Sequence, residues 1–194
     1  MHQDQLRLAI IIGSVREGRF GPTVGTWFAR VAGERPEFEI DLIDLADFDI
    51  PADMSSNADH QELASRIEAA DAAVVITPEY NHSFPGPLKI AIDSLKRQWQ
   101  AKPVGLISYG GMSGGLRAVE ALRIVFAELH AVTIRDVVAF PMASMKFNED
   151  GQPIEAEAVG IAAETLLNQL SWWGTALRKA RAEHPYGQPV ALAR

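Results

Sequence analysis

Five short apolar runs alternate along the chain with stretches in which apolar residues recur at helical spacing. The runs predict strands over residues 6–12, 38–45, 72–77, 102–109 and 131–140. The stretches between and after them predict helices over residues 23–32, 60–70, 87–99, 116–130 and 154–181. The third run is apolar almost throughout, and the first is apolar apart from Arg7, which is typical of strands buried on both faces. The second alternates apolar with acidic residues, so we expect it near an edge of the sheet.

Strands that alternate with helices predict a parallel sheet with helices on both faces. No repeat or interior linker divides the chain, so we expect one domain over residues 1–183 and a tail over 184–194. Five strands fit a flavodoxin-like α/β three-layer sandwich, with strand order 2-1-3-4-5, better than the larger dinucleotide-binding fold. Such sheets bind ligands beyond the carboxyl ends of their strands. The chemistry is therefore expected in the loops after the first, third and fourth strands.

Composition removes several classes of function. The chain has no cysteine, which excludes disulfides, thiol nucleophiles and cysteine-ligated metals. Its net charge of −7 has the wrong sign for coating nucleic acid or anionic lipid. No apolar stretch is long enough to span a bilayer or to form a signal-peptide core, and the histidines show no metal-ligand spacing. We expect a soluble, cytoplasmic protein with no nucleic-acid partner, no membrane partner and no metal.

The loop after the first strand, residues 13–23, has the features of a phosphate site. It leads into a helix start, where unpaired backbone N–H groups and the helix dipole favour an anion. Ser14 and Thr23 add hydroxyl donors, and Arg16 and Arg19 supply guanidinium groups. The P-loop pattern fails at its lysine position, and the G-x-G-x-x-G fingerprint is absent. A monophosphate bound without metal fits, and a plain turn with solvated arginines is the structural alternative.

The loop after the third strand, residues 77–87, is stiffened by three prolines and carries Tyr, Asn, His and Phe side chains. A flat heteroaromatic ring would rest on this wall and take hydrogen bonds from backbone amides and Asn81. A rigid connector with Tyr80 and Phe84 in the core explains the loop equally well. Whether His82 touches a substrate is left open.

The loop after the fourth strand holds four glycines in six residues, which lets the backbone approach a ligand closely. A flexible turn is the structural alternative. The loop also contains a G-x-S-x-G pattern around Ser113, followed in hydrolase order by Asp136 or Asp150 and then His184. Two extra glycines precede the pattern and His184 lies in a polar tail, so serine hydrolysis is only a minor alternative.

Together the three loops resemble the NADPH-dependent FMN reductase family, which is flavodoxin-like and includes quinone, azo-dye and chromate reductases. The resemblance covers roughly residues 6–140. It rests on G-S-x-R at 13–16, T-P-E-Y-N at 77–81, P-G-P-L-K-x-A-I-D at 85–93 and S-Y-G-G at 108–111. Many relatives have Ser where this chain has Arg19, and Asn where it has Gly21. The chain therefore resembles a branch that holds the phosphate with arginine.

The resemblance implies FMN as the cofactor and NADPH or NADH as the co-substrate. The FMN phosphate would be held by seven residues of the first loop, namely Ser14, Arg16, Arg19, Phe20, Gly21, Pro22 and Thr23. The isoalloxazine ring would be bordered, mainly by backbone groups, at Pro78, Glu79, Tyr80 and Asn81. The other edge of the ring and the ribityl chain would be lined by Ser108, Tyr109, Gly110 and Gly111.

The function implied is an FMN-dependent NAD(P)H oxidoreductase. It would pass hydride from a nicotinamide to FMN and then reduce a quinone, azo compound or similar acceptor in a ping-pong scheme, with no side chain as nucleophile or base. A flavodoxin-type electron carrier without turnover is the non-enzymatic alternative, although such carriers tend to be more strongly acidic.

Family members are usually dimers or tetramers with the flavin near a subunit interface, so the resemblance implies a homodimer or homotetramer. Trp99 either meets a partner subunit or packs in the core. Trp172 and Trp173 are adjacent on one helix and cannot face the same way. One of them is therefore expected to meet a neighbouring subunit or to cover the sheet edge.

Overall fold

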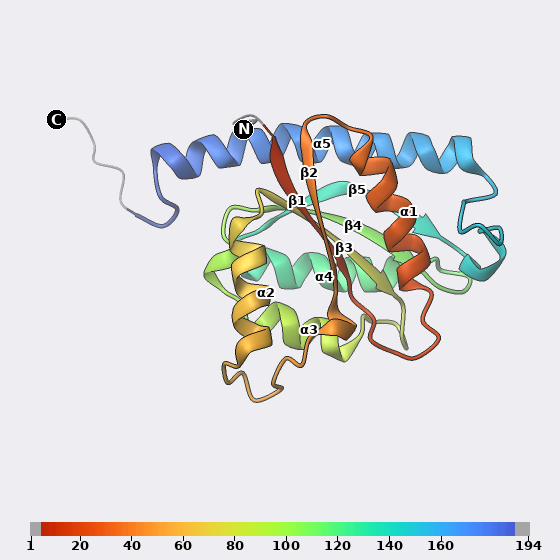
Figure 1. The fold of residues 1–194 in the computed structure, drawn as a ribbon, viewed down its shortest axis with the longest axis horizontal. Coiled ribbons are helices and arrows are strands. Elements are labelled where there is room, and N and C mark those ends of the chain that lie inside the picture. Colours follow the sequence, from red (N-terminus) through yellow and green to blue (C-terminus); the bar gives the residue numbers. More distant parts are fainter. Residues whose placement is uncertain (1–4, 189–194) are drawn as a thin grey trace.

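A computed structural model describes residues 5–188 of the chain. Residues 1–4, and 189–194 of the expected tail, lie outside the described part. The centre is a five-stranded parallel sheet in the order β2-β1-β3-β4-β5, which confirms the order expected from the sequence (Figure 1). Its strands are β1 (Leu6–Ile12), β2 (Phe38–Asp44), β3 (Ala72–Pro78), β4 (Pro103–Tyr109) and β5 (Val132–Phe140).

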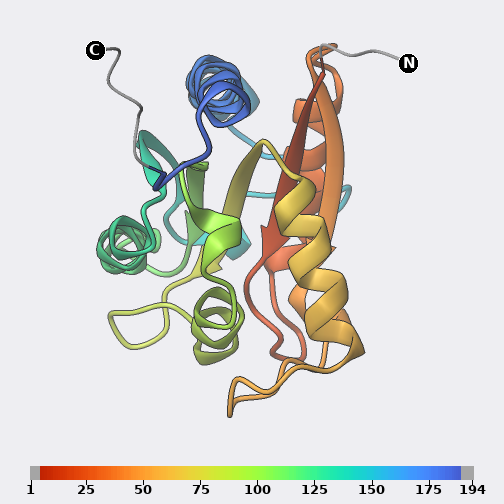
Figure 2. The ribbon, with the colours of Figure 1, turned by 90° about the vertical axis from the view of Figure 1, so that its left-hand side faces the viewer.

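Helices cover both faces of the sheet. They are α1 (Gly21–Gly33), α2 (Ala58–Ala69), α3 (Gly86–Asp93), α4 (Leu116–Glu128) and α5 (Ala156–Glu183). Three short 3₁₀ turns lie in the loops, namely η1 (Leu45–Asp47), η2 (Arg97–Trp99) and η3 (Ala143–Met145). Helices α1 and α5 pack on one face, and α2, α3 and α4 pack on the other (Figure 2). No helix among residues 5–188 has the length and apolar character to cross a membrane.

The apolar run of β1 shows why this arrangement forms. Successive side chains of a strand point to opposite faces, so a strand between two helical layers is apolar at every position. Leu6, Leu8 and Ile10 enter the core under α1 and α5. Ala9 and Ile11 enter the core under α2, α3 and α4. Helices on both faces leave the loops at the carboxyl edge of the sheet as the place for a ligand.

The helix predicted over residues 87–99 is wrong in its second half. Helix α3 ends at Asp93, where the Ser94 hydroxyl donates to a carbonyl of the last turn at 3.0 Å. The chain then turns and returns in η2. Of the two roles left open for Trp99, the structure shows the core role, because the side chain is 2% exposed and its Nε1 donates to the carbonyl of Ile92 at 3.2 Å.

Other boundaries shift by one or two residues for identifiable reasons. Strand β2 ends at Asp44 because that side chain accepts a hydrogen bond from the N–H of Ala46 at 3.0 Å and starts η1. Helix α2 begins two residues earlier than expected, since Asn57 caps it. Strand β3 continues through Pro78, which pairs in register with Tyr109.

The two tryptophans of α5 contact each other. The ring centroids of Trp172 and Trp173 lie 4.9 Å apart in an edge-to-face arrangement. Trp172 is 65% exposed and Trp173 is 36% exposed. Neither ring is buried against the sheet, so this aromatic pair stands on the surface of α5.

Candidate functional site

The loops after β1, β3 and β4 lie together at the carboxyl edge of the sheet, and side chains join them. Ser14 Oγ and Tyr80 Oη form a hydrogen bond of 2.8 Å between the first loop and the second. The Glu79 carboxylate accepts hydrogen bonds of 2.7 Å from Ser113 Oγ and from Arg117 Nη1, which join the second loop to the third. Folding therefore brings the three predicted loops into one connected assembly.

The N-terminus of α1 is a preformed place for an anion. Phe20 occupies the N-cap position without a capping side-chain hydrogen bond, and Pro22 lies in the first turn. The N–H of Thr23 has no acceptor within residues 5–188. Arg16 is exposed and takes part in no ion pair in the same part of the chain. Free N–H groups, a positive helix end and an open guanidinium favour phosphate.

A polar cluster lies beneath this loop. Arg19 Nη2 donates to Asp44 Oδ2 at 2.6 Å, across to the end of β2. Two further donors, Arg19 Nε and Tyr109 Oη, are buried and find no partner among the residues that the structure describes. Burial, with the nearby Tyr80 phenol, raises the pKa of Tyr109, so its hydroxyl stays protonated. Unpaired buried donors are costly, and a phosphate oxygen or a water at this point would satisfy them.

The first helical residue, Gly21, has no room for a side chain. A Cβ there would lie 2.7 Å from Cγ2 of Ile12 and 3.0 Å from Oη of Tyr109. Glycine at this position therefore lets the start of α1 pack closely against the end of β1 and the phenol of Tyr109. The residues present at this position fit an organic phosphate held at the start of α1.

The second loop contains a tight two-residue turn. Tyr80 and Ser83 exchange backbone hydrogen bonds of 2.8 and 3.1 Å, and Asn81 and His82 between them have φ values of 50° and 69°. The N–H of Glu79 donates to a carbonyl of β4 at 3.1 Å. The amides of Glu79 and Tyr80 are thus used inside the protein. Asn81 and His82 stand exposed at the tip of the turn and present the remaining N–H groups.

Glu79 holds the second and third loops together as a carboxylate. Its side chain is only 9% exposed. Burial acts to raise its pKa, but the hydrogen bonds from Ser113 and Arg117 outweigh burial and keep the pKa below its ordinary value. The carboxylate therefore stays ionised near neutral pH and remains a fixed acceptor for both partners.

The third loop begins with buried side chains, whereas Met112 at its tip is exposed. Ser108 is buried and its hydroxyl donates to the carbonyl of Gly114 at 2.8 Å. Gly115 has a φ of +87°, and a Cβ there would lie 2.7 Å from Cβ of Ser108. Gly110 donates to the carbonyl of Phe140 at 3.2 Å, whereas the N–H of Gly111 has no acceptor in the described chain. A ligand here would meet backbone groups.

The structure does not assemble a serine hydrolase triad. Ser113 donates its hydroxyl proton to Glu79 rather than to a histidine. His184 lies at the end of α5, where Arg181 donates to the carbonyl of Ala101, just before the amino end of β4. Ser113 follows the carboxyl end of the same strand. The proposed nucleophile and base therefore lie at opposite edges of the sheet.

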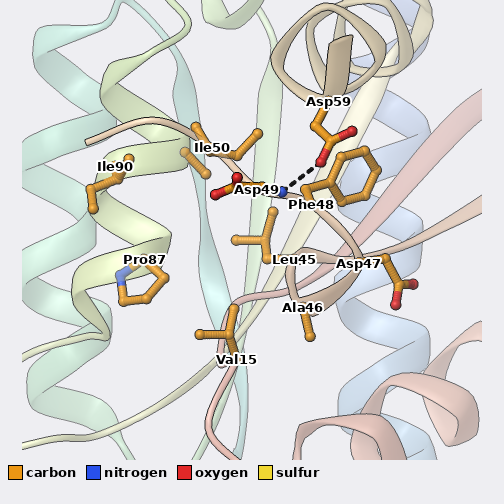
Figure 3. A pocket seen from close by; sticks show the side chains of 11 residues that line it. Val15, Leu45, Ala46, Asp47, Phe48, Asp49, Ile50, Asp59, Pro87 and Ile90 are labelled. Carbon is orange, nitrogen blue, oxygen red and sulfur yellow. Dashed lines mark hydrogen bonds between the residues drawn. The ribbon is translucent and has the colours of Figure 1, made fainter. Parts of the chain in front are cut away.

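Sequence reasoning missed the loop between β2 and α2. This loop forms one wall of a pocket of about 480 Å³, with Ile50 and Asp49 on one side and Ile90 and Pro87 of α3 on the other (Figure 3). The lining residues are Val15, Leu45, Ala46, Asp47, Phe48, Asp49, Ile50, Asp59, Pro87, Ile90 and Ala91. The sequence offered only one indication of a site here, which is that this loop also follows the carboxyl end of a strand.

Two residues predicted for the phosphate site also line a different hollow. Pro22 and Thr23 line a separate hollow of about 420 Å³, which they share with residues 149–152 of the loop before α5. Thr23 Cγ2 lies 3.6 Å from the position of a Cβ at Gly151. Among residues 5–188, no three His, Cys, Asp or Glu side chains gather in a way that could hold a metal ion.

Comparison with known proteins gives a family match and several relatives. A family model described as NADPH-dependent FMN reductase matches residues 6–144. An NAD(P)H-dependent FMN reductase of Schizosaccharomyces pombe is 34% identical over 120 residues, which cover 56% of this chain and 60% of that protein. A quinone reductase of Escherichia coli is 34% identical over 140 residues, which cover 68% of this chain and 74% of that protein.

A similar solved structure is a flavoenzyme NAD(P)H:acceptor oxidoreductase of Paracoccus denitrificans. It superposes with a TM-score of 0.73 at 22% identity, over 88% of this chain and 98% of that one. At this level of identity the similarity establishes the fold. The family match and the sequence relatives therefore carry the functional comparison.

Proposed function

Since the chain belongs to the NADPH-dependent FMN reductase family and is an FMN-dependent NAD(P)H oxidoreductase, we propose that its three linked loops form the flavin site. The first loop would hold the phosphate, the second would border the ring, and the third would line its other edge. The observation that carries this proposal is the pair of side-chain links, Ser14 to Tyr80 and Glu79 to Ser113, beside the uncapped start of α1.

Each loop has a distinct task in the proposed site. Ser14, Arg16 and Arg19 bind the phosphate through hydroxyl and guanidinium donors, and residues 20–23 form the helix start that adds the N–H of Thr23. The exposed turn of the second loop and the open amide of Gly111 orient the ring. These amides also stabilise negative charge that develops there on reduction. In the second loop we assign Pro78 and Glu79 a supporting role, since the N–H of Glu79 is already bonded within the protein.

Bound FMN would supply the redox chemistry, accepting hydride from the reduced nicotinamide and passing electrons to an acceptor. The chain itself binds and orients both substrates in turn, and no side chain is required as nucleophile or general base. The acceptor is a quinone, an azo compound or a similar small molecule. The quinone reductase relative from Escherichia coli supports this choice.

We also propose how the chain is organised and where it works. Residues 1–183 form the flavin-binding domain and residues 184–194 a tail, and the protein is a cytoplasmic homodimer or homotetramer. The exposed Trp172–Trp173 pair on α5 supports association, because large aromatic side chains on a surface are typical of protein interfaces.

The test is the visible spectrum of the freshly purified protein, followed by rapid mixing with NADPH. We expect the absorption bands of oxidised flavin at one FMN per chain, and loss of these bands on mixing. A colourless protein that binds no added FMN contradicts the flavin site. A protein that holds FMN but is not reduced by NADPH or NADH is the flavodoxin-type carrier instead.

A further inference from the structure

The pocket beside the flavin loops has the position and size of a substrate site. Val15 belongs to the first loop and Pro87 to the end of the second, so the pocket shares walls with two of the three proposed flavin loops. The remaining walls come from the β2–α2 loop and from α3. Its volume of about 480 Å³ lies within the range of small-molecule sites. No role is assigned to this space by the flavin site itself.

The walls of the pocket combine apolar surface with negative charge. Its apolar side chains are those of Val15, Leu45, Phe48, Ile50, Pro87 and Ile90. Its charged residues are Asp47, Asp49 and Asp59, and no lysine, arginine or histidine is among the lining residues. The apolar side chains suit a flat aromatic molecule, whereas the carboxylates disfavour an anionic one.

The loop that carries these residues is held in place by hydrogen bonds. The N–H of Asp49 donates to Asp59 Oδ2 at 2.7 Å (Figure 3), and the Asn57 side-chain amide donates to the carbonyl of Asp49 at 2.7 Å. Because both backbone groups of Asp49 are fixed, this wall is preformed, which lowers the entropy cost of binding. The exposed carboxylate of Asp49 has no side-chain partner within residues 5–188.

We propose that this pocket receives the aromatic body of the electron acceptor and selects uncharged or cationic acceptors over anionic ones. The proposal rests on the proposed function and adds the charge class of the acceptor. The same carboxylates would repel the phosphates of NADPH, so the dinucleotide must place its anionic half elsewhere. Asp49 is the carboxylate through which the selection can be tested, because its side chain is exposed and its replacement by Asn leaves the backbone hydrogen bond to Asp59 in place.

The experiment measures binding to the oxidised, FMN-loaded protein by calorimetry, without NADPH, so that no turnover occurs. The matched ligands are 1,4-naphthoquinone and its 2-sulfonate. We expect the neutral quinone to bind at least about fivefold more tightly, and Asp49→Asn to reduce that ratio about fivefold. One charge pair near 4 Å in water corresponds to a change of this size.

Two further variants complete the design. Glu157→Gln makes the same charge change in the exposed first turn of α5, and the ratio should stay at the parent value. Ala46→Trp fills the pocket without changing charge and should weaken both ligands at least tenfold. Equal affinity of the parent for the two quinones, or a ratio unaltered by Asp49→Asn, overturns the charge selection. Naphthoquinone affinity unaltered by Ala46→Trp overturns the pocket assignment.

These failures are distinct from failure of the proposed function. If the purified chain binds no FMN, the flavin site itself is wrong and the calorimetry is not reached. If it binds FMN and is reduced by NADPH, yet binds naphthoquinone in neither form, only the acceptor pocket is overturned.

Discussion

The two arginines of the first loop are in different electrostatic situations. Arg16 is exposed and takes part in no ion pair within residues 5–188. Arg19 already forms an ion pair with Asp44 at 2.6 Å, and both side chains are about one-fifth exposed. A phosphate at the start of α1 would therefore share Arg19 with a carboxylate of the protein. We infer that Asp44 weakens phosphate binding by competing for this guanidinium.

Asp44→Asn should consequently strengthen FMN binding. The amide oxygen can still accept the hydrogen bond from the N–H of Ala46, so the turn at η1 is kept while the competing charge is removed. We expect the dissociation constant to fall about fivefold, as expected for loss of one unit of like charge a few ångströms from the phosphate. Quenching of FMN fluorescence on titration with apoprotein measures it.

Arg16→Ala supplies the opposite change in the same titration. It removes an unshared cation and should raise the dissociation constant about tenfold, an effect typical of a charged hydrogen bond. If Asp44→Asn instead weakens FMN binding, then Asp44 serves to orient Arg19 and the competition described above is wrong.

The three loops of the proposed site could be singled out from the sequence, but the pairing of their side chains could not. Short motifs pointed to the three loops because glycines, prolines and a helix start have local physical meanings. The bonds between Ser14 and Tyr80, and between Arg19 and Asp44, join residues far apart in the sequence. Such contacts depend on how neighbouring strands place their loops, which no local pattern records. For the same reason the pocket behind Asp49 was missed.

At the scale of elements, hydrophobic period predicted all five strands and five helices, and errors concentrated at their ends. The helix expected over 87–99 stops at Asp93, although Leu95 and Trp99 continue to be buried. A buried residue in a 3₁₀ turn produces the same apolar spacing as one more turn of α-helix. The spacing of apolar residues indicates which residues are buried, whereas the backbone hydrogen bonds decide where the helix ends.

The clip formed by Glu79, Ser113 and Arg117 makes the third loop depend on the second. Arg117→Ala removes one of the two side-chain partners of Glu79 and leaves Ser113. We expect faster amide exchange over residues 108–117 and FMN binding weakened about threefold, because the loop loses its charged tether. Hydrogen-exchange mass spectrometry reads the first effect and fluorescence titration the second.

Arg135→Ala is the matched control for this tether. Arg135 lies exposed on the edge strand β5 and pairs with its neighbour Asp136 at 3.1 Å. Its loss should leave exchange over residues 108–117 unchanged. Equal exchange in the parent and in Arg117→Ala would show that the glycine turn alone holds the loop.

At the scale of the whole molecule, the two edges of the sheet have different chemistry. The carboxyl edge carries the loops of the proposed flavin site and the proposed acceptor pocket. The amino edge carries a buried lysine, Lys102, whose Nζ donates to the carbonyl of Ile67 at the end of α2. Burial, together with the nearby charge of Arg181, lowers the pKa of Lys102 to about 7, although Glu68 and Asp71 oppose the shift.

Lys102 should make the stability of the whole chain depend on pH. Between about pH 7 and 10.5 the unfolded lysine holds its proton and the buried one does not, so the free energy of unfolding rises with pH. The slope is at most about 1.4 kcal/mol per pH unit. Lys102→Met removes this dependence on pH. The free energy of unfolding of the variant should therefore exceed that of the parent by most below pH 7, and by less and less towards pH 9.5.

Urea unfolding at several pH values from 6 to 9.5 measures the effect. Lys179→Met is the control, since Lys179 is mostly exposed and its ion pair with Glu183 spans 3.9 Å. The free energy of unfolding of that variant should differ from that of the parent by the same amount at every pH. Parallel pH curves for the parent and Lys102→Met would contradict a neutral buried lysine.

We infer that the hydrogen bonds between the loops also decide when a newly made chain can bind its cofactor. The third loop is fastened to Glu79 through Arg117 and to the carbonyl of Phe140 through Gly110, so its anchors emerge from the ribosome one after another. A nascent chain that stops before β5 has the helix start for a phosphate and the Glu79 tether of the third loop, but it lacks the Phe140 anchor of that loop. Domains of this kind fold as units. We therefore expect cofactor binding to follow translation of nearly the whole sheet, and prematurely terminated products to be colourless.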